Sequence, residues 1–491
     1  MSERLAFGYG TSRHAGDTPA GHTRNDASRP GAEPAASAAP KTRRARSTEV
    51  KADAAFIGLM VFTALLFFRP QDQIRALNSL HLAEMSALAA LTAMVIGRLS
   101  RGLTLSRVTP ELSGVILMGG IILATAPFSI WPGGSISTFT EIYSKIILIF
   151  VLIVNTLTSR KRVEQFVWLI VIASSYIAFR AVLDSARGIN LVENGRVQGA
   201  VGGMFKNPND LALNMVAVIP LAASLSMRAV TLFGRASAAL GALLMVGAVI
   251  ASQSRSGTIG LAVIVAIMGV YLVRRKPAIA CAGVLALLLA LPLLPASYWH
   301  RLSSITDETQ DDTGSREARR TLLRESFAAF LQHPITGVGA GQFKNYDPEG
   351  REQPWRESHN VVLQVAAELG VVGLFMLLFL IARAGMAGRQ TQRLLRRASG
   401  LPGRGSRGRT GASLVTPDEA QWFLGHSAAM TAALAGWFFC ALFASVAYNW
   451  TFYYLLALAT APRELLIDRL SGMRPASPVA EPAARLQEAR V

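Results

Sequence analysis

The sequence predicts an all-α polytopic membrane protein, and three features indicate this class. Of its 491 residues 51% are hydrophobic and only 16% are charged, and the mean hydropathy is +0.35. Soluble proteins carry about a quarter charged residues. The apolar residues gather in blocks of about 15 to 25, the length that crosses a bilayer as a helix. We therefore expect about twelve transmembrane helices and one large periplasmic loop that contains short helices.

The apolar blocks follow one another through a predicted transmembrane domain at residues 53–462. Before it, residues 1–52 are basic and rich in Gly, Ala, Pro and Ser, so we expect a disordered N-terminal region. After it, residues 463–491 form a predicted tail. The first ten spans are expected at about 54–68, 80–97, 112–130, 139–157, 166–183, 208–226, 237–251, 259–273, 278–294 and 359–382, and the last two form a hairpin through 448–450.

The positive charge is concentrated in the predicted loops. There are 49 Lys and Arg against 31 Asp and Glu, a net charge of +18. In a soluble protein this excess would suggest nucleic acid, but no recognition motif is present. The basic residues lie in alternate loops, as the positive-inside rule predicts for cytoplasmic ones. We therefore expect both termini and a basic linker at 383–421 in the cytoplasm, and the large loop, 296–358, outside. The linker either contacts membrane lipids or is simply solvated.

Several cations are expected on the outer side, where the positive-inside rule does not explain them. Arg255 stands between two apolar blocks, either as an ordinary turn residue or as a ligand-binding group. In the large loop, Arg316, Arg320 and Arg324 are spaced to share one face of a helix. Such a face is often only solvated. Outside the membrane, however, it favours an anionic ligand, because guanidinium groups bind phosphate oxygens well.

His359 lies where the large loop meets the tenth apolar block. Histidine is the natural general base near neutral pH. The alternative is an interface residue that follows a helix cap at Ser358. Just upstream, the glycines at 337, 339 and 341 predict a sharp structural turn, because the lysine of a phosphate-binding loop is missing.

Neither a metal site nor a cofactor is predicted. The two cysteines, Cys281 and Cys440, lie far apart inside apolar blocks, as small buried residues do. The acidic residues of the predicted outer loops are scattered, without the spacing of metal ligands. They are Glu193, Asp210, Asp307, Asp311 and Asp312.

The order of short motifs resembles the O-antigen ligase and polysaccharide polymerase superfamily of bacterial inner-membrane glycosyltransferases. The motifs are Phe205–Ala212, Ser254–Gly257, Ser315-Arg316, His333–Gly339, Ser358-His359-Asn360 and Glu368-Leu369-Gly370. Each motif is short, but their order, spacing and predicted side of the membrane agree with the family. The resemblance covers roughly residues 54–462, without the basic N-terminal region.

The resemblance implies an enzyme in the bacterial inner membrane whose active site faces the periplasm. It would move a glycan from an undecaprenyl-pyrophosphate carrier to an acceptor hydroxyl, with inversion and without a metal. The family's essential groups map onto His359 as the catalytic base and onto Arg255 and Arg316 as ligands of the pyrophosphate. Further candidates on the predicted outer side are Arg320, Arg324, Arg180, Arg196, Lys206 and Asn360.

The acceptor stays open. We favour a ligase that transfers the glycan to lipid A core, because a single large loop lies late in the chain and closes with Ser-His-Asn. A polymerase that extends a growing O-antigen or exopolysaccharide, or a protein O-oligosaccharyltransferase, would use the same donor chemistry. A transporter of the lipid-linked glycan is the remaining alternative, although transporters usually carry ionisable residues near the middle of their spans.

Overall fold

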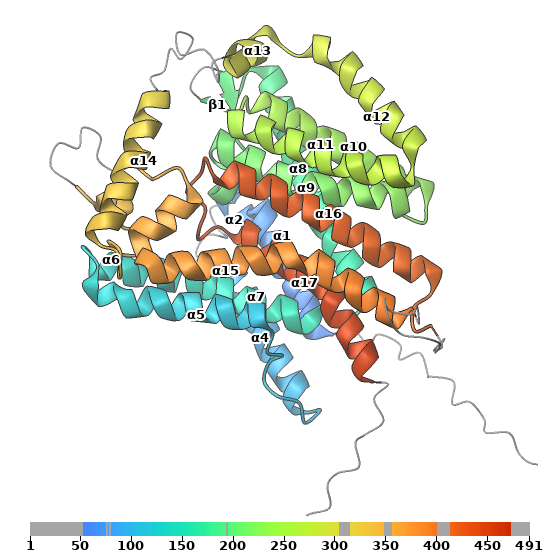
Figure 1. Cartoon of the computed structure of the whole chain (residues 1–491), viewed down its shortest axis with the longest axis horizontal. Helices are drawn as coiled ribbons and strands as arrows, with labels where there is room; N and C mark the ends of the chain where they lie inside the picture. Colours follow the sequence, from blue (N-terminus) through green and yellow to red (C-terminus); the bar gives the residue numbers. More distant parts are fainter. Residues whose placement is uncertain are drawn as a thin grey trace, which may run out of the picture. The chain divides into compact units, whose positions relative to one another are not determined.

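Long apolar helices dominate the computed structural model (Figure 1). It describes residues 53–74, 77, 80–192, 195–303, 315–347, 356–399 and 413–472. The predicted N-terminal region, 1–52, therefore lies outside the described residues, as do 473–491. Nine helices in the described part are long and apolar enough to cross a membrane. This confirms the all-α membrane fold.

The helices follow the predicted order of spans. The first half consists of α1 (Ala54–Phe68), α2 (Pro70–Gln73), α4 (Leu82–Leu99), α5 (Pro110–Thr125), η1 (Ala126–Phe128), α6 (Pro132–Ser137), the π-helical η2 (Thr138–Tyr143), α7 (Ser144–Thr156), α8 (Arg160–Arg187), β1 (Leu191–Val192) and β2 (Arg196–Val197). The second half consists of η4 (Gly203–Phe205), α9 (Pro208–Arg228), α10 (Leu232–Ala251), α11 (Arg255–Arg275), α12 (Pro277–Ala290), η5 (Leu291–Leu293), α13 (Ala296–Ser303), α14 (Ser315–Gln332), η7 (Phe343–Asn345), α15 (Val361–Ala398), α16 (Pro417–Ala441) and α17 (Trp450–Ser471).

Three of the twelve predicted spans are not among the nine membrane-length helices. They correspond to α1 and α12, with 15 and 14 residues, and to α17, whose last turns carry several charged residues. The predicted large loop does contain short helices, namely α13, α14 and η7.

Most of the long helices begin at a polar cap. The cap's side-chain oxygen accepts a hydrogen bond from a backbone N–H of the first turn, which otherwise lacks a partner. Proline follows the cap directly in α5, α9 and α16, where its missing N–H costs nothing. The caps of α1, α5, α8, α9, α10, α11, α15, α16 and α17 are Asp53, Thr109, Ser159, Asn207, Thr231, Ser254, Asn360, Thr416 and Asn449.

Helix α9 lies at the centre of its neighbours and is buried on most sides. It packs against α8, α10, α11 and α16, and nearly every residue from Leu211 to Leu225 is buried. A helix that is apolar all round suits this position. The loop before it forms the short antiparallel ribbon β1–β2, with Leu191 opposite Val197.

The basic loops gather at one end of the helices. Ion pairs between α1, α8, α16, α17 and the α4–α5 loop join them there, and we call this the arginine end. We call the opposite end, from which α15 starts beside His359, the His359 end. The pairs are Arg162 with Asp53 (3.0 Å), Arg160 with Asp418 (2.6 Å), Arg469 with Glu419 (2.7 Å) and Arg107 with Asp468.

Two helices continue past the predicted domain boundaries, for one physical reason. The predicted linker at 383–421 begins inside α15, which continues to Ala398, and the predicted domain end at 462 cuts α17, which continues to Ser471. Arg383 and Arg463 were the cations that marked these ends. Both are held inside the protein by the fully buried Glu111 of α5, at 2.7 and 2.6 Å. Of the predicted linker, residues 400–412 lie outside the described part.

Candidate functional site

His359 occupies a tight bend between the large loop and α15. Its φ of 50° is in the left-handed region, which non-glycine residues rarely adopt. The bend is fixed from the other side, because the backbone N–H of His359 donates to Ser445 Oγ at 2.9 Å. Ser445 lies in the turn between α16 and α17. The loop end, the start of α15 and the distant α16–α17 turn therefore fix the backbone of His359.

The surroundings of His359 keep its ring neutral. The side chain is half-buried. This burial, and then the charges of Arg319 and Arg356, lower the pKa of His359 to about 4. At neutral pH the imidazole can therefore accept a proton, but the imidazolium is disfavoured until the two positive charges are compensated. An anion bound beside these guanidinium groups would raise the pKa of His359.

Helix α14 supplies the first of those cations. The helix packs on α15 through a small apolar cluster that includes Leu322, Ala329 and Ala367. This packing brings Arg319 within electrostatic range of His359. Arg320 points elsewhere, since its side chain is 47% exposed and lies 3.8 Å from Glu317.

The other predicted arginines of α14 are less informative. Arg324 is exposed, one turn beyond Arg320. Arg316 begins the helix, but its side chain lies outside the described part of the structure.

A second group of polar residues surrounds the start of α11. Ser254 caps α11, so that Arg255 is the first helical residue, and it is half-buried. The Arg196 side chain is buried, and its guanidinium donates to Ser252 O at 3.1 Å and to Asn209 Oδ1 at 2.7 Å. Ser254 Oγ donates to the same Asn209 oxygen at 2.9 Å. This network fixes the β1–β2 ribbon, α9 and the start of α11 relative to one another.

Acidic residues join this second group to His359. Asp210, the neighbour of Asn209 on α9, lies within electrostatic range of Glu357, two residues before His359. Glu357 also lies within range of Glu368 on α15. The start of α9, the end of the large loop and the start of α15 therefore meet at the His359 end.

Two of the remaining candidates, Arg180 and Lys206, are not drawn into this site by any described contact. Arg180 Nη1 donates to Tyr176 Oη, one turn earlier on α8, at 3.5 Å, and Lys206 is exposed. Asn360 caps α15: its Oδ1 accepts from the N–H of Val362 and Leu363 at 2.9 and 3.0 Å. Ser358, offered above as an alternative cap, therefore lies two residues before the cap that the structure shows.

The glycine turn is structural, as predicted. Its backbone docks on α15 where Gly370, with φ of 63°, breaks the regular helix. The N–H groups of Val338 and Gly339 donate to the carbonyls of Ala367 and Glu368, at 2.8 and 2.9 Å. A Cβ on Gly370 would lie 2.3 Å from Ile335 O, so no larger residue fits there.

Glu368 is the centre of this junction. Its carboxylate accepts from Gly341 N and from Tyr448 Oη, both at 2.9 Å. The Glu-Leu-Gly motif therefore joins the large loop to the α16–α17 turn, which also holds His359. No group of three metal-binding side chains occurs among the described residues.

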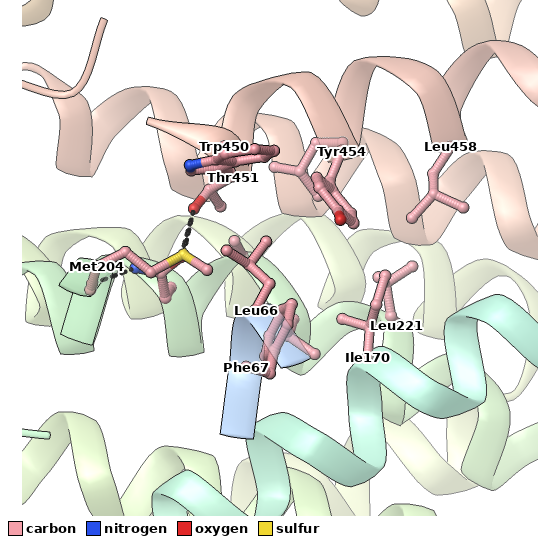
Figure 2. Close-up of a pocket in the computed structure, with 13 residues that line it drawn as sticks. Leu66, Phe67, Ile170, Met204, Leu221, Trp450, Thr451, Tyr454 and Leu458 are labelled. Atoms are coloured by element: carbon pink, nitrogen blue, oxygen red, sulfur yellow. Dashed lines mark hydrogen bonds between the residues drawn. The ribbon is translucent and has the colours of Figure 1, made fainter. Parts of the chain in front are cut away.

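Two cavities lie near the His359 end. One, of about 410 Å³, has charged walls, including Arg69, Lys145 and Glu84, but neither Arg255 nor His359 lines it. Glu84 of α4 is paired there with Lys145 at 2.8 Å. The other, shown in Figure 2, is an apolar gap between α1 and α17, with Leu66 and Phe67 facing Trp450 and Tyr454. At about 30 Å³ it has room for roughly one or two water molecules.

Arg319, Arg356 and Ser445 were missed as site residues. Arg319 follows Arg316 by three positions, which is also a same-face spacing on a helix. Arg356 lies three residues before the histidine, so proximity in the sequence was its signal. Nothing in the sequence indicated Ser445, because its contact with His359 crosses 86 positions.

Comparison with known proteins covers this part of the chain. Residues 240–378 match the family model described as O-antigen ligase. The predicted resemblance is confirmed. The O-antigen ligase match runs from α10 to α15 and includes Arg255, α14, the glycine turn and His359. It supports a membrane enzyme of the glycosyltransferase type, a ligase or a polymerase that acts on lipid-linked glycans. No curated protein matches the chain.

Proposed function

We propose that the protein transfers a glycan from an undecaprenyl-pyrophosphate carrier to an acceptor hydroxyl, with lipid A core as the favoured acceptor. The reaction is inverting and uses no metal. It takes place at the His359 end, which faces the periplasm of a bacterial inner membrane. His359 is the general base, and Arg319, Arg356 and Arg255 bind the pyrophosphate, together with Arg316.

The reaction requires a base that accepts the acceptor's proton and groups that stabilise the charge of the leaving group. The acceptor oxygen attacks the anomeric carbon and loses its proton to His359, while the bond from that carbon to the phosphate oxygen breaks. The bonding electrons leave with the pyrophosphate, which remains on the undecaprenyl carrier. Negative charge grows on the leaving group, and guanidinium groups that already point at it stabilise the transition state.

One observation carries the proposal: a half-buried imidazole, fixed at the end of the large loop by Ser445, within electrostatic range of two guanidinium groups. Without an anion, burial and then the two charges make His359 a weak base. A bound pyrophosphate compensates them, and the pKa of His359 rises toward neutrality, where a general base works best. The donor thus activates the base that its own transfer requires.

The test is complementation of a strain that lacks the protein. A His359→Ala variant should abolish transfer, with normal abundance in the membrane and accumulation of the lipid-linked precursor. The matched control is His333→Ala, a histidine of the same loop whose ring instead packs on Tyr346. Normal surface glycan from a well-expressed His359→Ala variant would contradict the catalytic role and favour a transporter.

The same gels distinguish the acceptors. A ligase predicts loss of all glycan attached to lipid A core. A polymerase predicts loss of long chains, while lipid A core capped with a single repeat unit persists. Loss of glycan from membrane or secreted proteins, with intact lipopolysaccharide, would instead identify a protein O-oligosaccharyltransferase.

A further inference from the structure

Another cavity lies at the arginine end, far from His359. It measures about 610 Å³ and is enclosed by the last turns of α11 and α15 and the first turns of α16. The same three helices reach the catalytic residues at their other ends. Because α11 runs for 21 residues between Arg255 and Arg275, the cavity lies roughly 30 Å from the proposed pyrophosphate site, about one hydrocarbon thickness.

The walls of the cavity are amphiphilic. Three arginines line it, Arg274 and Arg275 from α11 and Arg396 from α15, and none of its described lining residues is acidic. Most of the other lining side chains are apolar, among them Ile267 and Leu424. Positive charge therefore lies beside an apolar wall.

The cavity opens toward the surface that lipid would cover. Val270, one of its lining residues, is 55% exposed, and Val273 on the next turn is 61% exposed. Exposed valines on a membrane-spanning helix are expected to contact acyl chains. The occupant must then combine a negative head with an apolar tail.

We propose that this cavity binds an anionic phospholipid. Its phosphate contacts Arg274, Arg275 and Arg396, and an acyl chain lies against the apolar wall. Basic pockets between transmembrane helices bind lipid headgroups in this way. The segment 400–412 of this chain is not a suitable occupant, because it carries three arginines and no acidic residue. Free phosphate would leave the apolar wall uncovered.

The test uses the full-length protein in detergent, titrated with short-chain phosphatidylglycerol, phosphatidylcholine or inorganic phosphate. Binding is followed by native mass spectrometry and by the shift in melting temperature. We expect phosphatidylglycerol to bind at least tenfold more tightly than phosphatidylcholine. Replacing Arg274, Arg275 and Arg396 by Gln should weaken its binding by roughly tenfold or more. Equal affinity for the two lipids, or inorganic phosphate that competes at equal concentration, would overturn the proposal.

Two further variants make the test specific. The control removes three arginines outside the cavity, Arg389, Arg393 and Arg397, all exposed on the same part of α15, and should change binding less than about threefold. Equal weakening in both variants would mean diffuse attraction rather than a site. Ala428→Trp fills the cavity from α16 without changing charge and should also weaken binding. Unchanged binding by this variant, once shown to be folded, would contradict the proposal.

Discussion

A base beside positive charge is an unfavourable arrangement unless an anion is part of the reaction. The pKa of His359 is lowered to about 4, first by its burial and then by the charges of Arg319 and Arg356. In an enzyme with a neutral donor, such neighbours would only weaken the base. With a pyrophosphate donor, the same guanidinium groups bind the donor and, while no donor is bound, lower the pKa of His359. The exposure of an arginine on α14 therefore does not by itself predict its effect on catalysis.

Arg319 and Arg320 are adjacent, and we expect them to behave differently. Arg319→Gln should lower the rate of transfer roughly 10²-fold, the usual cost of losing one charge-stabilising group in a transition state. Arg320→Gln should lower it less than about fivefold, because Arg320 is in an exposed ion pair with Glu317. The measurement is the initial rate of undecaprenyl-pyrophosphate release by purified protein. An equal loss of rate in the two variants would mean that the arginines of α14 act through their summed positive charge and not through one specific contact.

The low pKa of His359 predicts an unusual dependence of activity on pH. Only the neutral ring accepts a proton, so activity is lost as the pH falls through the pKa of His359. For the free enzyme this pKa is about 4. The kcat/KM for donor should therefore stay almost constant from about pH 7 to about pH 5.5, where an unperturbed histidine would lose roughly tenfold. The kcat should fall at higher pH than kcat/KM, because bound pyrophosphate stabilises the imidazolium. A tenfold fall in kcat/KM over that range would exclude the perturbed base.

At the scale of elements, α15 performs two tasks that need different geometry. Its first residues position His359, and the rest crosses the membrane and continues to Ala398. Gly370 separates the two parts, because its φ of 63° lets the glycine turn of the large loop dock on the helix. The large loop is thereby tied to α15, and through Tyr448 and Glu368 to the α16–α17 turn.

Substitution of Gly370 should separate the glycine turn of the large loop from α15. In Gly370→Ala the new Cβ would meet Ile335 O at 2.3 Å, and alanine disfavours a positive φ. We expect a loss of roughly 2–4 kcal/mol in the free energy of unfolding, together with loss of activity. The control is Gly385→Ala on the same helix, where the added Cβ meets no atom within 4 Å. It should be neutral or slightly stabilising. Equal melting temperatures for the two variants would contradict the role of Gly370.

At the scale of the whole molecule, hydropathy and loop charge predicted the order of the helices, because the bilayer imposes both patterns on a local stretch of chain. The site was only partly predictable. His359 and Arg255 are conspicuous at the ends of apolar blocks, whereas the rotation of α14 that selects Arg319 depends on packing by Leu322 and Ala329. The continuation of α15 and α17 past the predicted boundaries has the same origin. Their arginines are neutralised by Glu111, which is distant in sequence.

Glu111 therefore holds α5, α15 and α17 together at the arginine end. It is fully buried and paired with Arg383 and Arg463. Glu111→Gln leaves the buried Arg463 with Glu464 as its remaining counter-ion and removes the buried charge that Arg383 also pairs with. We expect a loss of about 3–5 kcal/mol in the free energy of unfolding, measured by denaturation in detergent. The control is Glu84→Gln, which breaks an exposed pair with Lys145 and should cost less than about 1 kcal/mol. If both variants lose the same small amount, water reaches Glu111, and the three helices are joined by apolar packing alone.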